Sequence, residues 1–282
     1  MTVGDWLAST RRRLGPVAGG QAEREARLIL GEVTGWSAAR VATAGPEALS
    51  SGQVQAAETM VRRRLAREPM AQILGQWGFF GRKFRVTRDT LVPRPDTETL
   101  IEHALAAPFS RMIDLGTGSG AIAVTLLAER PEAEGLATDI SPAALEVAAG
   151  NAARHGVEGR LRLLEADWWA GVEGRFDLVV SNPPYVTEAE YAALAPEITR
   201  WEPRGALTPG GDGLAAYRAI LAGIDAHLRP GGRCLVEIGA GQGAAVAALF
   251  RGAGLDAVAV HPDINGKPRV VEGAMPNGHA RA

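Results

Sequence analysis

The sequence predicts an α/β fold with a mostly parallel sheet that ends in an antiparallel strand, preceded by a small helical bundle. From residue 112 onward, short apolar runs of strand type alternate with helical patterns, which is typical of parallel sheets. The last two strand patterns, at residues 255–260 and 269–272, have no helical pattern between them, so we expect them to pair antiparallel. The first 70 or so residues carry helical periodicity alone.

The composition is that of a globular protein. The chain has 282 residues, of which 46% are hydrophobic and 22% charged, enough for one large and one small domain. Its single cysteine, Cys234, excludes an intramolecular disulfide and a multi-cysteine zinc site, and we expect no metal ion. Cys234 lies in an apolar strand-like run, which predicts packing in the core. No apolar run reaches membrane-spanning length and the N-terminus lacks a secretory pattern, so we expect a cytoplasmic protein without a membrane partner.

The net charge of −2 is unevenly distributed. Residues 1–85 carry 13 Arg and Lys against 7 Asp and Glu, whereas residues 86–282 carry 17 against 25. The front of the chain therefore suits an acidic partner or an RNA surface. A solvated helix face is an equally good explanation of the run Arg62, Arg63 and Arg64.

Residues 1–72 are predicted to form a helical domain that recognises the substrate, because no catalytic constellation accompanies its helices. Three stretches have the spacing of an amphipathic helix. Their apolar residues are Trp6, Leu7 and Leu14, then Ala22, Ala26, Ile29, Leu30 and Val33, then Val54, Ala57, Val61 and Leu65.

Residues 73–92 switch to aromatic and β-branched residues broken by glycines, which predicts a β-hairpin that links the front to residues 93–282. The segment Pro93–Glu98 then opens a helix, with Asp96 or Thr97 as the candidate cap. His103 lies on that helix, where packing or solvent exposure is expected rather than a role as a base.

A glycine loop follows the strand Met112–Leu115 and precedes the helix Ala121–Arg130. It consists of Gly116, Thr117, Gly118, Ser119 and Gly120. Glycines let the backbone approach a ligand and leave the N-terminal amides of the helix facing it. The loop alone is a weak signal, because nicotinamide and flavin enzymes use similar loops.

Acidic and aromatic residues at two further strand ends strengthen that signal. The strand Gly135–Ile140 brings Asp139 about 20 residues past the loop, where a carboxylate can accept both hydroxyls of a ribose. Asp167 and Trp168 follow the strand Leu161–Leu164 and suit an adenine, through its exocyclic amine and by stacking. Core packing is the competing role for Trp168. Together these residues predict an adenosine-type ligand.

The most informative stretch is Asn182-Pro183-Pro184-Tyr185, which ends the Val-rich strand Phe176–Ser181. The prolines have fixed φ and no N–H, so the turn presents carbonyls without competing donors. The Asn182 side-chain oxygen and the Pro183 carbonyl can accept both N–H bonds of a planar amide or an exocyclic amine, with Tyr185 as an aromatic wall. The motif predicts methylation of a nitrogen, with Asn182, Pro183 and Tyr185 catalytic and Pro184 also contacting the substrate.

The remainder of the chain completes the alternation. Residues 186–213 are predicted to form a long irregular lid that shapes the substrate site. A helix over Leu214–Leu228, a strand over Gly232–Ile238 and a helix over Gly243–Phe250 follow.

Nearly the whole chain resembles a known family. The alternation, the reversed last strand and the loop Asp114–Gly120 are similar to the Rossmann-like sheet of class I S-adenosylmethionine-dependent methyltransferases. Four further features resemble HemK/PrmC-type protein-(glutamine-N5) methyltransferases. They are the helical front with the hairpin Ile73–Gly81, the segment Pro93–Glu98, the motif Asn182–Tyr185, and the ending Asp263–Val270.

The resemblance implies S-adenosyl-L-methionine as the cofactor, S-adenosyl-L-homocysteine as the product, and the Gly-Gly-Gln glutamine of class 1 peptide chain release factors as the substrate. By position, Gly116–Gly120 would surround the methionine part of the cofactor, Asp139 its ribose and Trp168 its adenine region, with Asn182 close to both cofactor and substrate. Asn182–Tyr185 would hold the glutamine. Ile264-Asn265 stand where the family more often has Leu-Ala, which puts no site residue in doubt.

Two alternatives stay open. An adenine-N6 methyltransferase acting on DNA or RNA presents a similar NH₂ group to the motif, but it needs a strongly basic face. The net charge of −8 over residues 86–282 argues against it, so nucleic acid is not expected as a substrate. A non-catalytic adaptor that binds a translation factor through the helical front is disfavoured by intact Asn182 and Tyr185 beside an intact glycine loop.

Overall fold

The computed structural model describes residues 1–277, which divide into two compact units. The smaller unit consists of Met1–Gly75 together with Ala195–Trp201, and the larger one of Gln76–Leu194 together with the chain from Glu202 onward. The segment Ala195–Trp201 therefore belongs to the smaller unit, although the residues on both sides of it in the chain belong to the larger one. In the described part of the chain, no helix is both long and apolar enough to cross a lipid bilayer.

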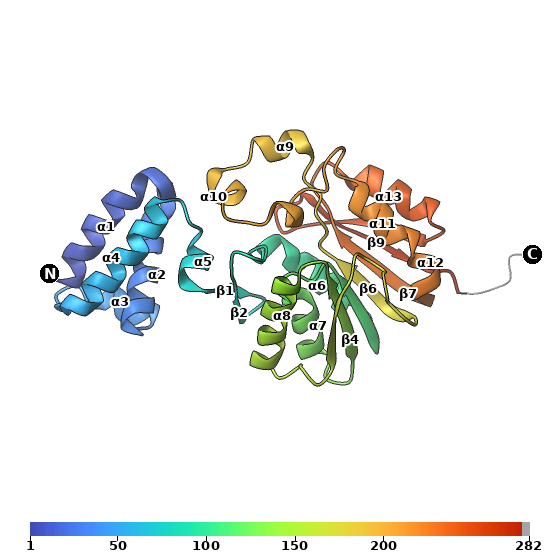
Figure 1. Ribbon diagram of the computed structural model, residues 1–282, viewed down its shortest axis with the longest axis horizontal. Coiled ribbons are helices and arrows are strands. Elements are labelled where there is room, and N and C mark those ends of the chain that lie inside the picture. The colour runs from blue at the N-terminus through green and yellow to red at the C-terminus, as the bar shows by residue number, and fades with distance from the viewer. Residues whose placement is uncertain (278–282) are drawn as a thin grey trace, which may run out of the picture. The chain divides into compact units, whose positions relative to one another are not determined.

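The smaller unit is helical, as predicted, and its three long helices pack on one another (Figure 1). Trp6, Leu14, Ile29, Leu30 and Val61 are fully buried between them. The three short helices, of four to six residues each, gave no periodic signal in the sequence because each contains only one or two turns. The helices are α1 (Val3–Ala18), α2 (Ala22–Thr34), α3 (Ala38–Thr43), α4 (Ser51–Leu65), α5 (Met70–Leu74) and, from the internal segment, α10 (Pro196–Thr199).

Ion pairs and hydrogen bonds connect the internal segment and the helices of the smaller unit. Arg67 donates to Glu197 Oε1 at 2.9 Å, and the Gln72 side-chain amide donates to the Trp201 carbonyl at 2.9 Å. Arg64 is buried and donates to Glu25 Oε2 at 2.8 Å, and Arg63 donates to Glu68. Two of the three arginines at 62–64 therefore pair with acidic side chains of the smaller unit, and Arg64 is the buried one of that run.

The larger unit is built on a sheet with the strand order β5-β4-β3-β6-β7-β9-β8 in the described residues. Strand β9 runs antiparallel to both neighbours and the other pairs are parallel, which confirms the predicted fold. The strands are β3 (Arg111–Leu115), β4 (Glu134–Asp139), β5 (Leu161–Glu165), β6 (Phe176–Ser181), β7 (Leu228–Glu237), β8 (Asp256–Pro262) and β9 (Pro268–Ala274).

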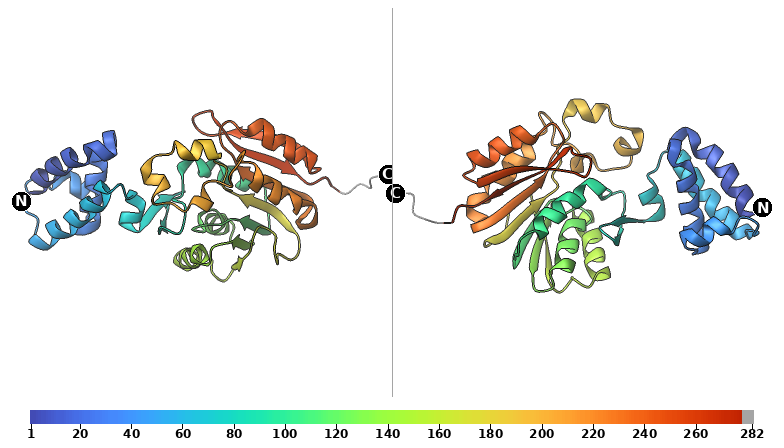
Figure 2. Two further views of the ribbon diagram at one scale, coloured as in Figure 1. Left: turned by 45° about the horizontal axis from the view of Figure 1, so that its top comes forward. Right: turned by 180° about the vertical axis from the view of Figure 1, so that it is seen from behind.

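Helices cover both faces of this sheet (Figure 2). Successive strand residues point to opposite faces, so Met112 and Val180 lie in one core cluster while Ile113 and Val179 lie in the other. The first cluster is closed by α6 (Glu98–Leu105), α7 (Ala121–Glu129) and α8 (Pro142–Arg154), and the second by α11 (Ala215–Ala222), α12 (Ile224–His227) and α13 (Gly243–Gly252). Cys234 is fully buried in the second cluster, as predicted.

The predicted hairpin is present but shorter than residues 73–92. Strands β1 (Gln76–Phe79) and β2 (Arg82–Arg85) pair antiparallel around Phe80 and Gly81, whose φ values of 45° and 71° are those of a tight hairpin turn. Phe80 is strained there because it carries a Cβ. Its N–H donates to Glu98 Oε1 at 2.8 Å, which ties the turn to α6.

Two boundary predictions in the second half were wrong. The helix expected over Leu214–Leu228 is divided at Gly223, where the Trp169 indole N–H donates to the Ile220 carbonyl at 2.8 Å and so takes the acceptor of the next helical hydrogen bond. The Trp169 ring leaves no space for a Cβ on Gly223. Leu228 already belongs to β7. The segment 186–213 is not wholly irregular, since it contains short helices: α9 (Glu188–Ala192), α10 and the 3₁₀ turn η3 (Arg204–Ala206).

Candidate active site

A cavity of about 460 Å³ opens where the strand order of the sheet reverses. The chain passes from β3 outward to β4 and β5 and then returns to β6 on the other side of β3. Ligands of open α/β sheets bind at such a reversal, outside the carboxyl ends of the strands. The cavity is lined there mainly by residues that follow β3, β4, β5 and β6, and its volume suits a small-molecule ligand. Residues from two other segments complete the lining: Asp89, Thr90, Leu91, Pro93 and Thr97, and then Pro203, Gly205, Ala206 and Pro209.

The residues predicted to bind the cofactor line this cavity with one exception. The predicted residues that line it are Gly116, Thr117, Gly118, Ser119, Asp139, Trp168 and Asn182. Gly120 is not among the lining residues. It is the N-cap of α7 with a φ of 77°, and a Cβ there would lie 3.1 Å from the Ala148 side chain, so this glycine serves the packing of α7 on α8.

The buried carboxyl group of Asp114 holds the glycine loop and the first turn of α7 together. Asp114 Oδ2 accepts hydrogen bonds from the Thr117 hydroxyl at 2.7 Å and from the Ala123 N–H at 3.3 Å. Burial raises the pKa of Asp114 to about 7. Gly116 and Gly118 adopt positive φ values of 71° and 55°, and a Cβ on either would meet no protein atom within 4 Å. The loop therefore leaves open space for a ligand against its backbone.

Asp139 connects this loop to the next strand end. Its Oδ2 accepts from the Gly118 N–H at 2.8 Å and its Oδ1 from the Ser141 N–H at 2.9 Å. A carboxylate oxygen has two acceptor sites, so each oxygen can take one further hydrogen bond. Asp139 thus shapes the glycine loop and still offers acceptors for two hydroxyl groups.

The far wall of the cavity is apolar. Trp168 is half-buried, lines the cavity and also packs against the second core cluster, so both roles weighed for it from the sequence have support. Its φ of 51° is unusual for a bulky residue. Ile140 is 69% exposed and lines the same cavity, although we did not select it from the sequence. Asp167 is exposed beside them.

The Asn-Pro-Pro-Tyr turn divides between the cavity and the interior. Asn182 and Pro184 line the cavity, whereas Pro183 and Tyr185 are not among its lining residues. The Asn182 Nδ2 group donates to Thr97 Oγ1 at 3.2 Å, which leaves Oδ1 as the acceptor that this side chain can offer a ligand. The Tyr185 hydroxyl donates to Glu237 Oε1 at 3.2 Å, and burial together with Glu237 raises the pKa of this phenol.

Thr97 and Glu237 support this turn, and sequence reasoning missed both roles. The Thr97 hydroxyl donates to Glu237 Oε2 at 2.6 Å. Thr97 occupies the N-cap position of α6 but makes no capping hydrogen bond, because its backbone is helical (φ −66°, ψ −19°) and not extended. Glu237 is fully buried at the end of β7, and burial raises its pKa to about 7. An acidic residue within the apolar run Leu235–Ile238 was the available signal.

Glu98 and Phe80 are not among the residues that line the cavity. They contact each other through the Phe80 N–H, and their place in the larger unit is that of hairpin and helix support.

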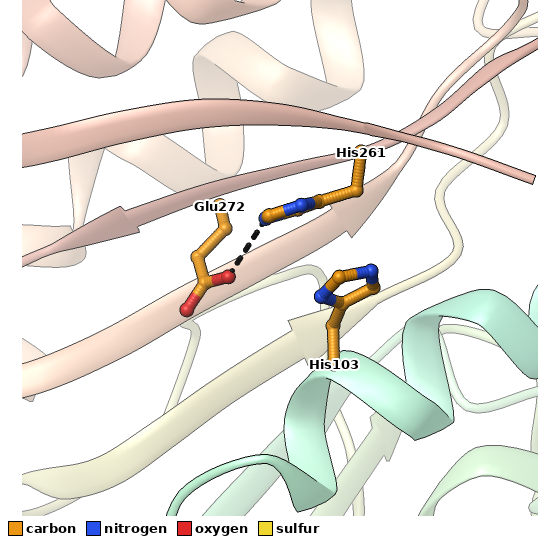
Figure 3. Close-up of side chains that lie close together, drawn as sticks. All are labelled: His103, His261 and Glu272. Atoms are coloured by element: carbon orange, nitrogen blue, oxygen red, sulfur yellow. Dashed lines mark hydrogen bonds and ion pairs between the residues drawn. The ribbon is translucent and has the colours of Figure 1, made fainter.

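His103 forms a separate cluster with His261 and Glu272 (Figure 3). The two imidazole rings stack with centroids 3.8 Å apart at 24°, and His261 Nε2 lies 2.9 Å from Glu272 Oε2. Burial and the neighbouring His261 lower the pKa of His103. The nearly parallel rings direct their in-plane lone pairs side by side rather than toward one point, and Arg233 already pairs with Glu272 at 3.0 Å. The geometry favours packing, as expected for His103, over metal binding.

The sheet with its reversed strand, together with a glycine loop and an acidic strand end around one cavity, defines a class I methyltransferase. The Methyltransferase small domain matches residues 95–216 and the PrmC N-terminal domain matches residues 5–75. The chain belongs to the release factor glutamine methyltransferase family. It is 54% identical over 276 residues to the protein of that name from Cereibacter sphaeroides, covering 98% of this chain and 99% of the relative.

A second relative of the same name, from Rhodospirillum rubrum, is 45% identical over 249 residues, which are 87% of this chain and 77% of that protein. Among solved structures, a methyltransferase from Pyrococcus furiosus has a TM-score of 0.55 at 18% identity and covers 78% of this chain and 99% of its own. This likeness concerns the fold alone. The family membership confirms the resemblance seen in the sequence, with S-adenosyl-L-methionine as the cofactor.

Proposed function

We propose that this protein transfers a methyl group from S-adenosyl-L-methionine to the side-chain amide nitrogen, N5, of the glutamine in the Gly-Gly-Gln motif of class 1 peptide chain release factors. One observation carries the proposal. Asn182 keeps its amide nitrogen on Thr97 and so offers a carbonyl oxygen at a cavity whose other walls are the glycine loop and Asp139. The names of the relatives supply the substrate.

The cofactor-side residues follow from the chemistry of each wall. The backbone of Gly116–Ser119 would accept the methionine part, the free acceptor sites of Asp139 the ribose, and the apolar wall of Ile140 and Trp168 the adenine. The bound cofactor supplies a methyl group that its sulfonium already activates. The protein therefore has to place the glutamine nitrogen in line with that methyl group.

The substrate side has to counter the delocalisation of the amide nitrogen lone pair. The Asn182 Oδ1 atom at the cavity accepts one N–H bond of the glutamine. The main-chain carbonyl of Pro183 accepts the other, although the residue itself is buried and is not among those that line the cavity. The two acceptors orient the nitrogen and favour the positive charge that develops on it. Holding the reactants in line supplies several kcal/mol more, up to roughly 7–11. The methylated nitrogen then loses a proton to water, since its charge makes it acidic.

The partner and the location belong to the same proposal. The helical unit, residues 1–72 with the internal segment, recognises the release factor, and its match to the PrmC N-terminal domain supports that role. Nucleic acid is not the substrate, because residues 86–282 carry a net charge of −8. Release factors act in the cytoplasm, which suits a chain with a single cysteine.

Labelled methyl transfer from S-adenosyl-L-methionine tests the proposal. The acceptors are a purified class 1 release factor, its Gln→Ala variant in the Gly-Gly-Gln motif, and duplex DNA. We expect label on the unaltered factor alone. Label on DNA would favour the adenine alternative, label on the Gln→Ala variant would place the acceptor elsewhere on the factor, and no label on any acceptor would favour the adaptor.

A further inference from the structure

The Thr97 hydroxyl joins a buried carboxylate, that of Glu237, to the Asn182 side chain. Glu237 Oε2 accepts from the Thr97 hydroxyl at 2.6 Å, and Thr97 Oγ1 accepts from the Asn182 amide at 3.2 Å. The other oxygen, Oε1, accepts from the Tyr185 hydroxyl at 3.2 Å. The hydroxyls of Thr97, at the N-cap of α6, and of Tyr185, in the turn after β6, converge on this fully buried carboxylate, and Asn182 is connected to it through Thr97.

The single hydrogen of the Thr97 hydroxyl determines whether the NH₂ group or the carbonyl oxygen of the Asn182 side chain points toward Thr97. A threonine hydroxyl has one hydrogen and two acceptor sites. When the Thr97 hydroxyl donates that hydrogen to the Glu237 carboxylate, it can only accept from Asn182, so the NH₂ end of the amide must face Thr97. The carbonyl oxygen of Asn182 is then left for the substrate. An amide turned the other way would present two N–H donors to the donors of the glutamine, and neither would find an acceptor.

We infer that Glu237 and Thr97 are positioning residues that set the orientation of the Asn182 amide, through the single hydrogen of Thr97, for a substrate that presents an NH₂ group. This inference rests on the proposed function, because it assigns the cause of the acceptor that the function needs. Protonation of Glu237 releases the constraint, since a carboxylic acid can donate to Thr97 and free the threonine hydrogen for Asn182 Oδ1.

The charges around Glu237 bear on its protonation. Arg269 favours the carboxylate, whereas burial and Asp96 favour the neutral acid. Arg269 lies 3.0 Å from Asp96 and 3.6 Å from Asp263, so its charge is shared among acidic groups. Tyr185 faces Glu237 as a neutral phenol, and the Tyr217 hydroxyl donates to the Glu237 main-chain carbonyl at 3.0 Å. Burial raises the pKa of Glu237 to about 7, so the relay changes state near neutral pH.

The test compares Thr97→Val with Thr97→Ser in release factor methylation at saturating S-adenosyl-L-methionine. Valine keeps the shape of threonine and removes the relay, whereas serine keeps the hydroxyl. We expect kcat to fall about 10- to 100-fold in Thr97→Val, the effect of an unpaired buried donor, and to stay within about 3-fold in Thr97→Ser. The affinity for the cofactor, measured by calorimetry, should change less than 3-fold in both.

The pH profile of kcat separates positioning from structural support. The unaltered enzyme should lose activity as the pH falls through about 7, whereas Glu237→Gln, which cannot titrate, should lack this acid limb. Equal kcat in Thr97→Val and Thr97→Ser, or an unchanged acid limb in Glu237→Gln, would overturn the inference. If Thr97→Val does not fold, the profile of Glu237→Gln decides alone. Failure of the unaltered enzyme to label the release factor would instead refute the proposed function, and this inference with it.

Discussion

The cavity wall proposed to hold the cofactor, called the cofactor wall, and the wall proposed to hold the glutamine, called the substrate wall, are constructed in different ways. On the cofactor wall, Asp114, Thr117, Gly118 and Asp139 hydrogen-bond to partners within about two dozen residues in the chain, and most of the acceptors or donors are backbone groups. On the substrate wall, Asn182 is held by side chains from distant parts of the sequence, Thr97 and Glu237. The first wall is a local property of strand, loop and helix, while the second exists only after the sheet has formed.

The difference has a functional meaning. A loop that binds a fixed cofactor needs only backbone amides and one acidic side chain, and many folds provide these. A site that must orient one particular amide needs a defined direction for each donor and acceptor. Four mutations, given from the largest expected effect to the smallest, separate the two walls.

Asn182→Ala should break the substrate wall alone. We expect kcat for release factor methylation to fall on the order of 100- to 1,000-fold, because the acceptor that orients the nitrogen in the transition state is lost. The affinity for S-adenosyl-L-methionine should change less than about 3-fold. Steady-state kinetics and calorimetry provide both values. A comparable loss in both would mean that Asn182 serves the cofactor rather than the glutamine.

Asp139→Ala should break the cofactor wall. The cofactor Kd should rise on the order of 10- to 100-fold, since hydrogen bonds to a charged acceptor are lost. At saturating cofactor, kcat should recover to within about 5-fold of the unaltered enzyme. Asp139→Asn is the matched control, since its amide oxygen can still accept from the Gly118 N–H, and its Kd should lie between the two. A kcat that does not recover would show that the walls are coupled.

Glu237→Gln should change how stability depends on pH. The pKa of Glu237 is raised to about 7 in the folded protein from an ordinary value of 4.5. Between these values the unfolded chain has lost this proton and the folded one keeps it, so the unaltered protein loses stability as the pH rises and loses no more above about 7. The variant should gain on the order of 1–3 kcal/mol relative to it between pH 5 and pH 8.

Denaturant unfolding of both proteins at the two pH values measures this difference. Asp114 has a similarly raised pKa, but it is present in both proteins and cancels in the comparison. A relative stability that does not change with pH would show that Glu237 is ionised in the folded state throughout this range.

Tyr185→Phe should have the smallest effect. It removes one neutral hydroxyl from Glu237 Oε1, while Thr97 still donates to Oε2. We expect kcat to fall about 2- to 10-fold with unchanged cofactor affinity. Tyr217→Phe is the control and should lower kcat less. The hydroxyl of Tyr217 donates to the main-chain carbonyl of Glu237 and to the Gln242 side chain, not to the Glu237 carboxylate. If Tyr185→Phe is as severe as Asn182→Ala, the hydroxyl acts directly on the substrate.

The same contrast explains which parts could be predicted from the sequence. The glycine loop and Asp139 are joined by local spacing, so a pattern of strand, glycines and acid was sufficient to find them. Asn182 was found because its two prolines make the motif rare. Thr97 and Glu237 are 140 positions apart, and nothing in the local sequence of either indicates the other. Each was therefore assigned only a local role, a helix cap in one case and a strand residue in the other.

Several further details of the structure could not be predicted from the periodicity of apolar residues in the sequence. Ile140 follows a buried strand and was expected to belong to it, yet it is 69% exposed at the cavity. The interruption at Gly223 depends on the Trp169 ring, which comes from another loop. The short helices α3 and α5 contain too few residues for a hydrophobic period to be recognised.

The segment Ala195–Trp201 limits how this protein can change by gene exchange. Its Glu197 and its Trp201 carbonyl bind Arg67 and Gln72, so the smaller unit is encoded by two separate stretches of the gene. A single crossover after residue 75 would transfer the N-terminal helices and leave behind Glu197, the side-chain partner of Arg67. The smaller unit is therefore encoded in part by a stretch that lies within the larger one, and a chimera of two relatives keeps the native pair of Arg67 and Glu197 when both stretches come from the same parent.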